Sequence, residues 1–314
     1  MSVVLNLNSY LNIAYTNIEM INTLTKNPVI TNMCLLCSVV AICFSKFKRA
    51  AVVWTYFCFS LWFMCFSTAT VWYRTSKTEQ QLPDAGFDMF YYVYTKFVKK
   101  ALHAHKFLDL LVLVMIFGTF IFVFTQRTRF RILMRYLVLH GTLMLMRSFL
   151  LLVTTFPDPY PGCQKLIPGT QTWRNISVLK VWNDAMRMLT NDPNNITCGD
   201  ACPSGHTFIF ILCALTWHSY FPSKKYFNFI KIMVWWVGLS GCCILVLTRM
   251  HYTIDVLIAS YLTITLWYGY HRILKIVESH VPYQHVLGVD GLLLYPAIGW
   301  LETGKPFSSF VSVE

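Results

Sequence analysis

The stretch Phe229–Leu247, FIKIMVWWVGLSGCCILVL, contains one charged residue and is long enough to cross a bilayer as a helix. Five other stretches are similarly apolar, namely Ala50–Tyr73, Lys106–Thr125, Ile132–Thr154, His206–Phe221 and Tyr252–His271. Together they predict an all-α, polytopic integral membrane protein with about six transmembrane helices. A shorter apolar run, Val29–Phe44, favours a helix that lies in the membrane interface over a seventh span.

The composition favours the same class of protein. Of the 314 residues, 56% are apolar and 13% are charged, whereas soluble domains average about 25% charged residues. These values argue against a soluble enzyme, a disordered chain and a nucleic-acid-binding protein. The formal net charge of +12 then needs an explanation other than a surface for nucleic acid.

The basic residues provide that explanation, because they gather in alternate loops between the predicted spans. The clusters are Lys46 to Arg49, Arg127 to Arg135, Lys224 to Lys231, and Arg272 with Lys275. The positive-inside rule places these loops and both termini in the cytosol. The lumenal side then holds residues 74–105, 155–205 and the very short loop 248–251. The second of these loops contains glycosylation sequons at Asn175 and Asn195.

The predicted organisation therefore has three parts. Residues 1–49 form a cytosolic segment that includes the interfacial run at 29–44. Residues 50–272 form a six-helix transmembrane catalytic domain, and residues 273–314 form a cytosolic tail.

Two polar segments stand out at the lumenal face, CGDACPSGHT at 198–207 and RMHYTID at 249–255. On a helix, His251 and Asp255 would share one face, so the carboxylate could hold one imidazole nitrogen and leave the other as a nucleophile. His206 follows Ser204 and Gly205 at a helix start, where backbone N–H groups favour a phosphate oxygen. The pair predicts phosphoryl transfer through a covalent phosphohistidine, without a metal. The alternative is that each histidine only caps a helix or anchors at the headgroup level.

Charged residues near these segments are candidates for substrate contacts. Arg249 is next to the proposed nucleophile, and Arg147 is an arginine inside a predicted span, which indicates function. Arg147 could equally be a snorkelling or structurally paired side chain. Asp109 would pair with Arg147 or with a cationic headgroup, and Asp200 could take either role.

The cysteines do not predict a metal site. Cys34 and Cys37 form a C-x-x-C unit, but no set of further ligands accompanies them. In an oxidising lumen, Cys163 could form a disulfide with Cys198 or Cys202, and the sequence does not decide the connectivity.

At this point a resemblance to a known family is evident. Pro203-Ser204-Gly205-His206 and His251-x-x-x-Asp255 resemble two motifs of the lipid phosphatase/phosphotransferase superfamily. Their extended forms are similar to those of the sphingomyelin synthase family, as are Leu82-Pro83-Asp84 and the third-span pattern Gly141-Thr142-Leu143 followed by Arg147. Cys202-Pro203 departs from that family and follows the spelling of the lipid phosphatases.

The resemblance implies a ceramide phosphotransferase that uses no cofactor. It would move a phospho-headgroup, phosphocholine before phosphoethanolamine, from phosphatidylcholine or phosphatidylethanolamine to ceramide and release diacylglycerol. His251 would be the nucleophile, Asp255 would orient it, and His206 would act as acid and then as base. Ser204 and Gly205 would bind phosphate at the helix start.

Alternative activities remain open from the sequence. They are a lipid phosphate phosphatase, an inositol phosphorylceramide synthase, and a transporter that uses Arg147 and Asp109 as intramembrane charges. The partners would be the two lipids and the bilayer, with no nucleic acid, and the chain could form a homo-oligomer. We expect a Golgi or plasma membrane location, with the endoplasmic reticulum as an alternative, and a site that faces the lumen or cell exterior.

Overall fold

The structure is a computed structural model that describes residues 48–75, 81–98, 104–160, 176–189, 201–222, 227–278 and 289–304. The chain divides into two units between Val52 and Val53, and of the first unit only Lys48–Val52 are described. All that follows concerns the second unit. The run Val29–Phe44, the sequon asparagines Asn175 and Asn195, and Asp200, Cys163 and Cys198 lie outside the described residues.

Every regular element in the described ranges is a helix, which confirms the all-α class. The elements are α3 (Lys48–Arg74), α4 (Ala85–Met89), α5 (Tyr91–Val93), the π-helical turn η2 (Tyr94–Val98), α6 (Ala104–Thr125), α7 (Arg129–Val153), α8 (Val178–Leu189), α9 (Gly205–Tyr220), α10 (Phe227–Leu247), α11 (Thr253–Glu278) and α12 (Val289–Thr303). Six of them coincide with the predicted spans to within a few residues, except that α11 runs seven residues further.

Four helices in the described ranges are long and apolar enough to cross a membrane, in agreement with an integral membrane protein. They are Lys48–Arg74, Phe107–Thr125, Arg129–Val153 and Asn228–Leu247. Large apolar side chains such as Phe117 and Trp236 are more than 60% exposed on these helices, as expected for lipid-facing surfaces. Helices α9 and α11 are not among the four, so the count of six spans stays a prediction.

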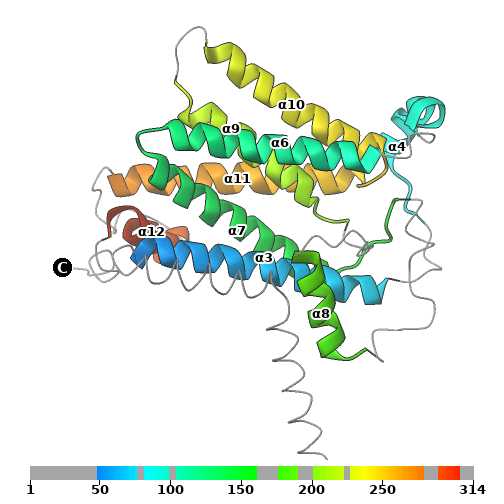
Figure 1. Cartoon of the computed structure of the whole chain (residues 1–314), viewed down its shortest axis with the longest axis horizontal. Helices are drawn as coiled ribbons and strands as arrows, with labels where there is room; N and C mark the ends of the chain where they lie inside the picture. The colour runs from blue at the N-terminus through cyan, green and yellow to red at the C-terminus, as the bar shows by residue number, and fades with distance from the viewer. Residues whose placement is uncertain are drawn as a thin grey trace, which may run out of the picture. The chain divides into compact units, whose positions relative to one another are not determined.

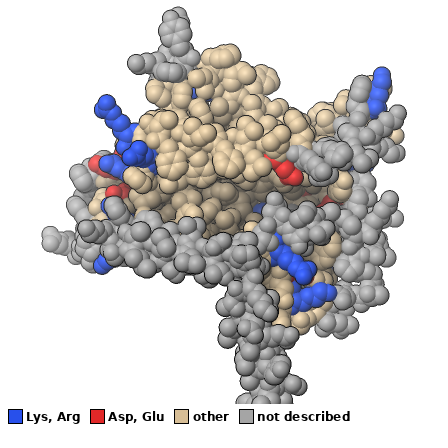
Figure 2. All heavy atoms as spheres, viewed as in Figure 1, with Lys and Arg blue, Asp and Glu red and all other residues tan. Residues whose placement is uncertain are grey.

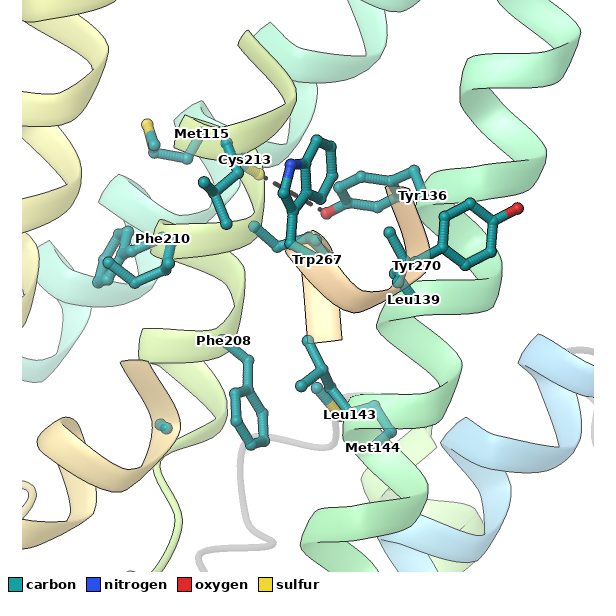
Figure 3. Packing of buried hydrophobic residues seen from close by; sticks show 14 of the residues in the cluster. Met115, Tyr136, Leu139, Leu143, Met144, Phe208, Phe210, Cys213, Trp267 and Tyr270 are labelled. Carbon is teal, nitrogen blue, oxygen red and sulfur yellow. Dashed lines mark hydrogen bonds between the residues drawn. The ribbon is translucent and has the colours of Figure 1, made fainter. Parts of the chain in front are cut away.

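Helix α9 lies at the centre of the bundle, where it contacts α6, α7, α10 and α11. It is only 16 residues long, and Phe208, Phe210 and Leu212 are almost completely buried. Figure 3 shows Phe208 and Cys213 of α9 near core side chains of α7 and α11. Gly241 of α10 permits close contact, because a Cβ atom there would lie 2.6 Å from the Phe210 ring. The packing thus fixes the axis of the helix that begins with the PSGH motif.

The helix ends that carry the candidate site residues lie together. Figure 1 shows that α6, α9 and α11 begin, and α7 and α10 end, toward the right of the view. On the face drawn in Figure 2, charged atoms gather toward the helix ends and the described surface between them is largely uncharged. This distribution suits a bundle that is embedded in a bilayer.

Helix α12 is a feature that the sequence pattern does not indicate, since it falls within the predicted tail. Tyr295, Ile298 and Leu301 are buried in the main core. Glu302 binds the Arg135 side chain of α7 through two hydrogen bonds of 2.7 and 2.8 Å. Both side chains are about nine-tenths buried, so this ion pair fastens α12 to the bundle.

Helix α8, in the long loop between α7 and α9, packs against α3. Val181 and Ala185 are buried against Ala69 and Tyr73. The Tyr73 hydroxyl donates a hydrogen bond to the Asp184 carboxylate. The loop therefore contains a helix that is anchored to the bundle close to its site end.

Candidate active site

His206 occupies the first turn of α9. Ser204 is the N-cap of this helix, and its hydroxyl accepts a hydrogen bond of 3.2 Å from the Thr207 amide. This cap leaves other amides at the helix start available to an anion. The His206 side chain is 29% exposed, and its Nε2 lies 3.4 Å from Oδ1 of Asp109, on the neighbouring helix α6. A contact between these two residues was not foreseen from the sequence.

His251 lies just before α11, in the turn that connects it to α10. Its Nδ1 is 2.8 Å from the Ala201 carbonyl oxygen, and its side chain is 8% exposed. A carbonyl can only accept, so Nδ1 carries a proton, and in the neutral ring Nε2 then holds the lone pair. Such a tautomer leaves Nε2 as the nucleophilic nitrogen. The expectation that His251 and Asp255 lie on one helix is wrong, because α11 begins at Thr253.

Asp255 nevertheless faces the imidazole. Its side chain is completely buried, and Oδ2 lies 3.7 Å from His251 Nδ1. The same oxygen accepts a hydrogen bond of 2.8 Å from the Tyr252 amide, at the start of α11. The short bond that orients His251 therefore comes from Ala201, and Asp255 adds a negative charge beside the ring.

The two histidine rings are close to each other. Their centroids are 5.9 Å apart and their planes are inclined by 61°. This separation allows one phosphoryl group to lie between a nitrogen of each ring. The start of α9 and the turn before α11 thus form one site.

Arg147 contributes a cation at the same place. Its side chain is buried, and its Nε donates a 2.8 Å hydrogen bond to the Pro203 carbonyl. A Cβ atom on Gly205 would lie 3.5 Å from that Nε, so the guanidinium lies against the first residue of α9. The positive charge and the positive end of the helix dipole therefore act on the same space.

Arg249 has different surroundings from those of Arg147. It has a positive φ of 57°, and its guanidinium carbon lies 4.3 Å from the Tyr94 ring centroid and 5.1 Å from that of Phe87. These are cation–π contacts with the α4 to η2 segment. A role for Arg249 as a phosphate contact stays a prediction.

Cys202 lies at the site as a neutral thiol next to Asp255, a position that the sequence did not indicate. It is a free, buried thiol in the structure, so the disulfide considered from the sequence is not present at this position. Burial, together with the negative charge of Asp255, raises the pKa of the Cys202 thiol to about 12. The thiol therefore stays neutral beside that carboxylate at physiological pH.

Asp84 is a second such residue, and the Leu82-Pro83-Asp84 motif was its only signal in the sequence. Its carboxylate binds the first residue of α11 through the Thr253 amide and hydroxyl, at 2.8 and 2.6 Å.

Among the described residues, no group of three or more histidine, cysteine or acidic side chains is placed to hold a metal ion.

Comparison with known proteins shows what the segment around this site resembles. Residues 197–272 match the family model described as PAP2 superfamily C-terminal. This range contains both histidines, Asp255, Arg249 and the whole of α9. The resemblance to the lipid phosphatase/phosphotransferase superfamily is confirmed over these residues.

Curated relatives narrow the resemblance further. The chain is 34% identical over 130 residues to a phosphatidylethanolamine:ceramide ethanolaminephosphotransferase of Trypanosoma brucei brucei, a match over 41% of this chain and 37% of the relative. It is 30% identical over 139 residues to phosphatidylcholine:ceramide cholinephosphotransferase 2 of Rattus norvegicus, over 44% and 37% of the two chains. It is also 30% identical over 152 residues to sphingomyelin synthase-related protein 1 of Mus musculus, over 48% and 30%.

These matches confirm the resemblance to ceramide phosphotransferases. The chain spans less than two-fifths of the length of each of these relatives.

Proposed function

We propose that this protein is a ceramide phosphotransferase that works through a phosphohistidine on His251. The observation that carries the proposal is the geometry of this imidazole: Nδ1 is bound to the Ala201 carbonyl at 2.8 Å, and the ring lies 5.9 Å from that of His206. An oriented nucleophile next to a second titratable group is the arrangement that covalent phosphoryl transfer requires. The named activities of the relatives support the same reaction.

In the first half-reaction, Nε2 of His251 attacks the phosphorus of a glycerophospholipid. The bond between phosphorus and the diacylglycerol oxygen breaks, and protonated His206 gives its proton to that oxygen. Diacylglycerol leaves, and the phospho-headgroup remains on His251. In the second half-reaction, His206 takes the proton of the primary hydroxyl of ceramide, this oxygen attacks phosphorus, and the P–N bond breaks.

The surrounding charges suit these steps. The His251 ring keeps its Nδ1 proton and becomes cationic when Nε2 is phosphorylated. The Asp255 carboxylate lies 3.7 Å from Nδ1 and so stands beside the cationic ring. Asp109 is placed to accept a hydrogen bond from protonated His206. Arg147 and the start of α9 would bind the phosphoryl oxygens, with Ser204 and Gly205 shaping that start.

For the transferred group, we propose phosphocholine before phosphoethanolamine. Both headgroups are cationic, and the Asp109 carboxylate, 57% exposed and 3.4 Å from His206, can attract either one. The printed names of the relatives include one activity of each kind. We further propose that the site faces the lumen or the cell exterior, and that the membrane is that of the Golgi or the cell surface.

The test is an assay of the purified protein with ceramide and defined phospholipid donors, read by headgroup-resolved mass spectrometry. A new phosphosphingolipid, formed with one donor and dependent on ceramide, supports the proposal. Release of phosphate from phosphatidic acid without ceramide dependence would identify a lipid phosphate phosphatase, and an inositol-containing product would identify an inositol phosphorylceramide synthase.

Two variants test the separate roles of the histidines. His251→Ala should abolish the labelled phosphoenzyme. His206→Ala should slow both half-reactions by about 10²–10⁴-fold, because one side chain serves as acid and base. A phosphoenzyme that persists in His251→Ala would contradict the assignment of the nucleophile.

A further inference from the structure

The Leu82-Pro83-Asp84 motif has no role in the reaction derived above, although it lies against the turn that holds His251. We propose that Asp84 is a positioning residue for His251, which it holds in place by joining the starts of α4 and α11. This inference rests on the proposed nucleophilic role of His251, in a transferase or in a phosphatase.

The Asp84 carboxylate joins two helix starts. Oδ1 accepts hydrogen bonds from the Gly86 and Phe87 amides at 3.0 and 3.1 Å, which caps α4. The same oxygen accepts from the Thr253 hydroxyl at 2.6 Å, and Oδ2 accepts from the Thr253 amide at 2.8 Å. Residues 169 positions apart in the chain are thus joined by one side chain.

The neighbours of Asp84 strengthen this junction. The Leu82 amide donates a 3.1 Å hydrogen bond to the Tyr252 hydroxyl, and the Phe87 and Tyr252 rings stack with centroids 5.5 Å apart. Gly86 touches α11 so closely that a Cβ atom there would lie 2.1 Å from the Thr253 hydroxyl oxygen. Only a residue without a side chain fits this contact.

The turn with His251 is therefore held by three contacts where it enters α11. Ala201 binds the His251 ring, Asp255 binds the Tyr252 amide, and Asp84 binds Thr253. Arg249, in the same turn, has a φ of 57°, a conformation that a non-glycine residue keeps only when its surroundings enforce it.

Two features separate this role from direct catalysis. Both oxygens of Asp84 are occupied by four protein donors, so the carboxylate has its hydrogen bonds within the fold. Among the contacts of the described residues, none joins Asp84 to either histidine. Asp84 would thus act on the reaction through the position of the Tyr252 to Thr253 backbone.

Asp84→Asn is the most informative variant. An amide with its oxygen at the Oδ1 position keeps the cap of α4, but its NH2 group then faces the Thr253 amide and cannot accept from it. We expect kcat to fall about 10–100-fold, since a small misplacement of a reacting group costs about 10²-fold. The KM values for donor and ceramide should stay within about threefold, because the lipid contacts are untouched.

Two comparisons show whether the effect passes through Thr253. Thr253→Val removes only the hydroxyl bond and should lower kcat about 3–10-fold. The double variant should be slower than Asp84→Asn alone by no more than the factor of Thr253→Val, because the two changes remove different bonds, to the Thr253 amide and to its hydroxyl, of one junction. Asp88→Asn makes the same chemical change at an exposed position of α4 and should stay within about twofold of the unchanged protein.

The rate of phosphoenzyme formation, counted per folded molecule by size exclusion, gives the readout that a merely structural role would not move. A lower rate per folded molecule supports the proposal, and an unchanged rate in Asp84→Asn overturns it. Should Asp84→Asn fail to fold, the rate of Thr253→Val decides in the same way. If the unchanged protein makes no phosphosphingolipid, the proposed transferase function fails, and phosphate release from phosphatidic acid replaces the transfer assay. The effect of Asp84→Asn on that release then tests the positioning role separately.

Discussion

Replacement of Asp255 by asparagine separates the charge of this residue from its structural role. Asparagine has almost the same volume, and its side-chain oxygen can still accept from the Tyr252 amide at the start of α11. What it removes is the negative charge 3.7 Å from His251 Nδ1. The variant therefore tests whether that charge stabilises the cationic ring that forms during phosphoryl transfer.

The distance gives the expected size of the effect. Two unit charges about 4 Å apart interact by about 4 kcal/mol at an effective dielectric constant of about 20. Since about 1.4 kcal/mol corresponds to a factor of ten in rate, phosphoenzyme formation should slow by about 10³-fold. The charge on the ring develops only as the P–N bond forms, so KM for the donor should change by less than about threefold.

The assay is the single-turnover formation of phosphohistidine from a donor labelled in its phosphate, with thermal unfolding of the same samples as a check on folding. Asp88→Asn, at an exposed position of α4, is the matched control and should react at the unchanged rate. A folded Asp255→Asn protein that retains more than about a tenth of the normal rate would refute the reasoning, since the missing charge would then contribute under about 1.4 kcal/mol.

Asp109→Asn should slow turnover by only about 3–10-fold, because this carboxylate is 57% exposed and its interaction with His206 is screened by water, and steady-state rates at low and high salt will check this. Arg147→Gln should lower kcat by about 10²-fold or more through loss of a cation at the start of α9, as measured in the same lipid assay. Burial raises the pKa of the Cys202 thiol, so this thiol should react with iodoacetamide at pH 8 much more slowly in the folded than in the unfolded protein, which peptide mass spectrometry can follow. Glu302→Gln should destabilise the protein by about 3 kcal/mol, because the buried Arg135 charge loses its two short bonds and keeps only Glu278 at 3.7 Å and the Tyr220 hydroxyl at 3.3 Å. Thermal unfolding will show whether a second change, Arg135→Met, restores stability.

Much of the fold was predictable because a bilayer imposes a strong rule on sequence. Helices such as α6 and α10 need long apolar stretches, and these are visible without knowledge of the tertiary contacts. Helix α12 was not predictable in this way. It is 15 residues long and contains Pro296, and its position depends on burial of Tyr295, Ile298 and Leu301 and on the ion pair of Glu302 with Arg135, which is far away in the chain.

In the candidate site, too, some residues were predictable from local sequence and others depend on tertiary contacts. His206 and His251 are recognisable because each lies in a polar motif at the edge of an apolar stretch. The Ala201 carbonyl that orients His251 carries no sequence signal, since every residue has a backbone carbonyl. Asp84 had a motif as a signal, but its partner Thr253 is 169 residues away, and only the folded chain shows that the two meet.

The paired carboxylates at the start of α11 have a consequence for motion. The first amides of a helix lack partners within the helix, so this end normally opens and exchanges hydrogen with solvent fastest. Here the consecutive amides of Tyr252 and Thr253 are each bound to a carboxylate at 2.8 Å. Any local opening of this turn releases Asp255 from its place beside His251. The competent fraction of the enzyme at any moment is then limited by the closed fraction of one helical turn, and warming that frees this turn should halt turnover while the surrounding bundle is still folded.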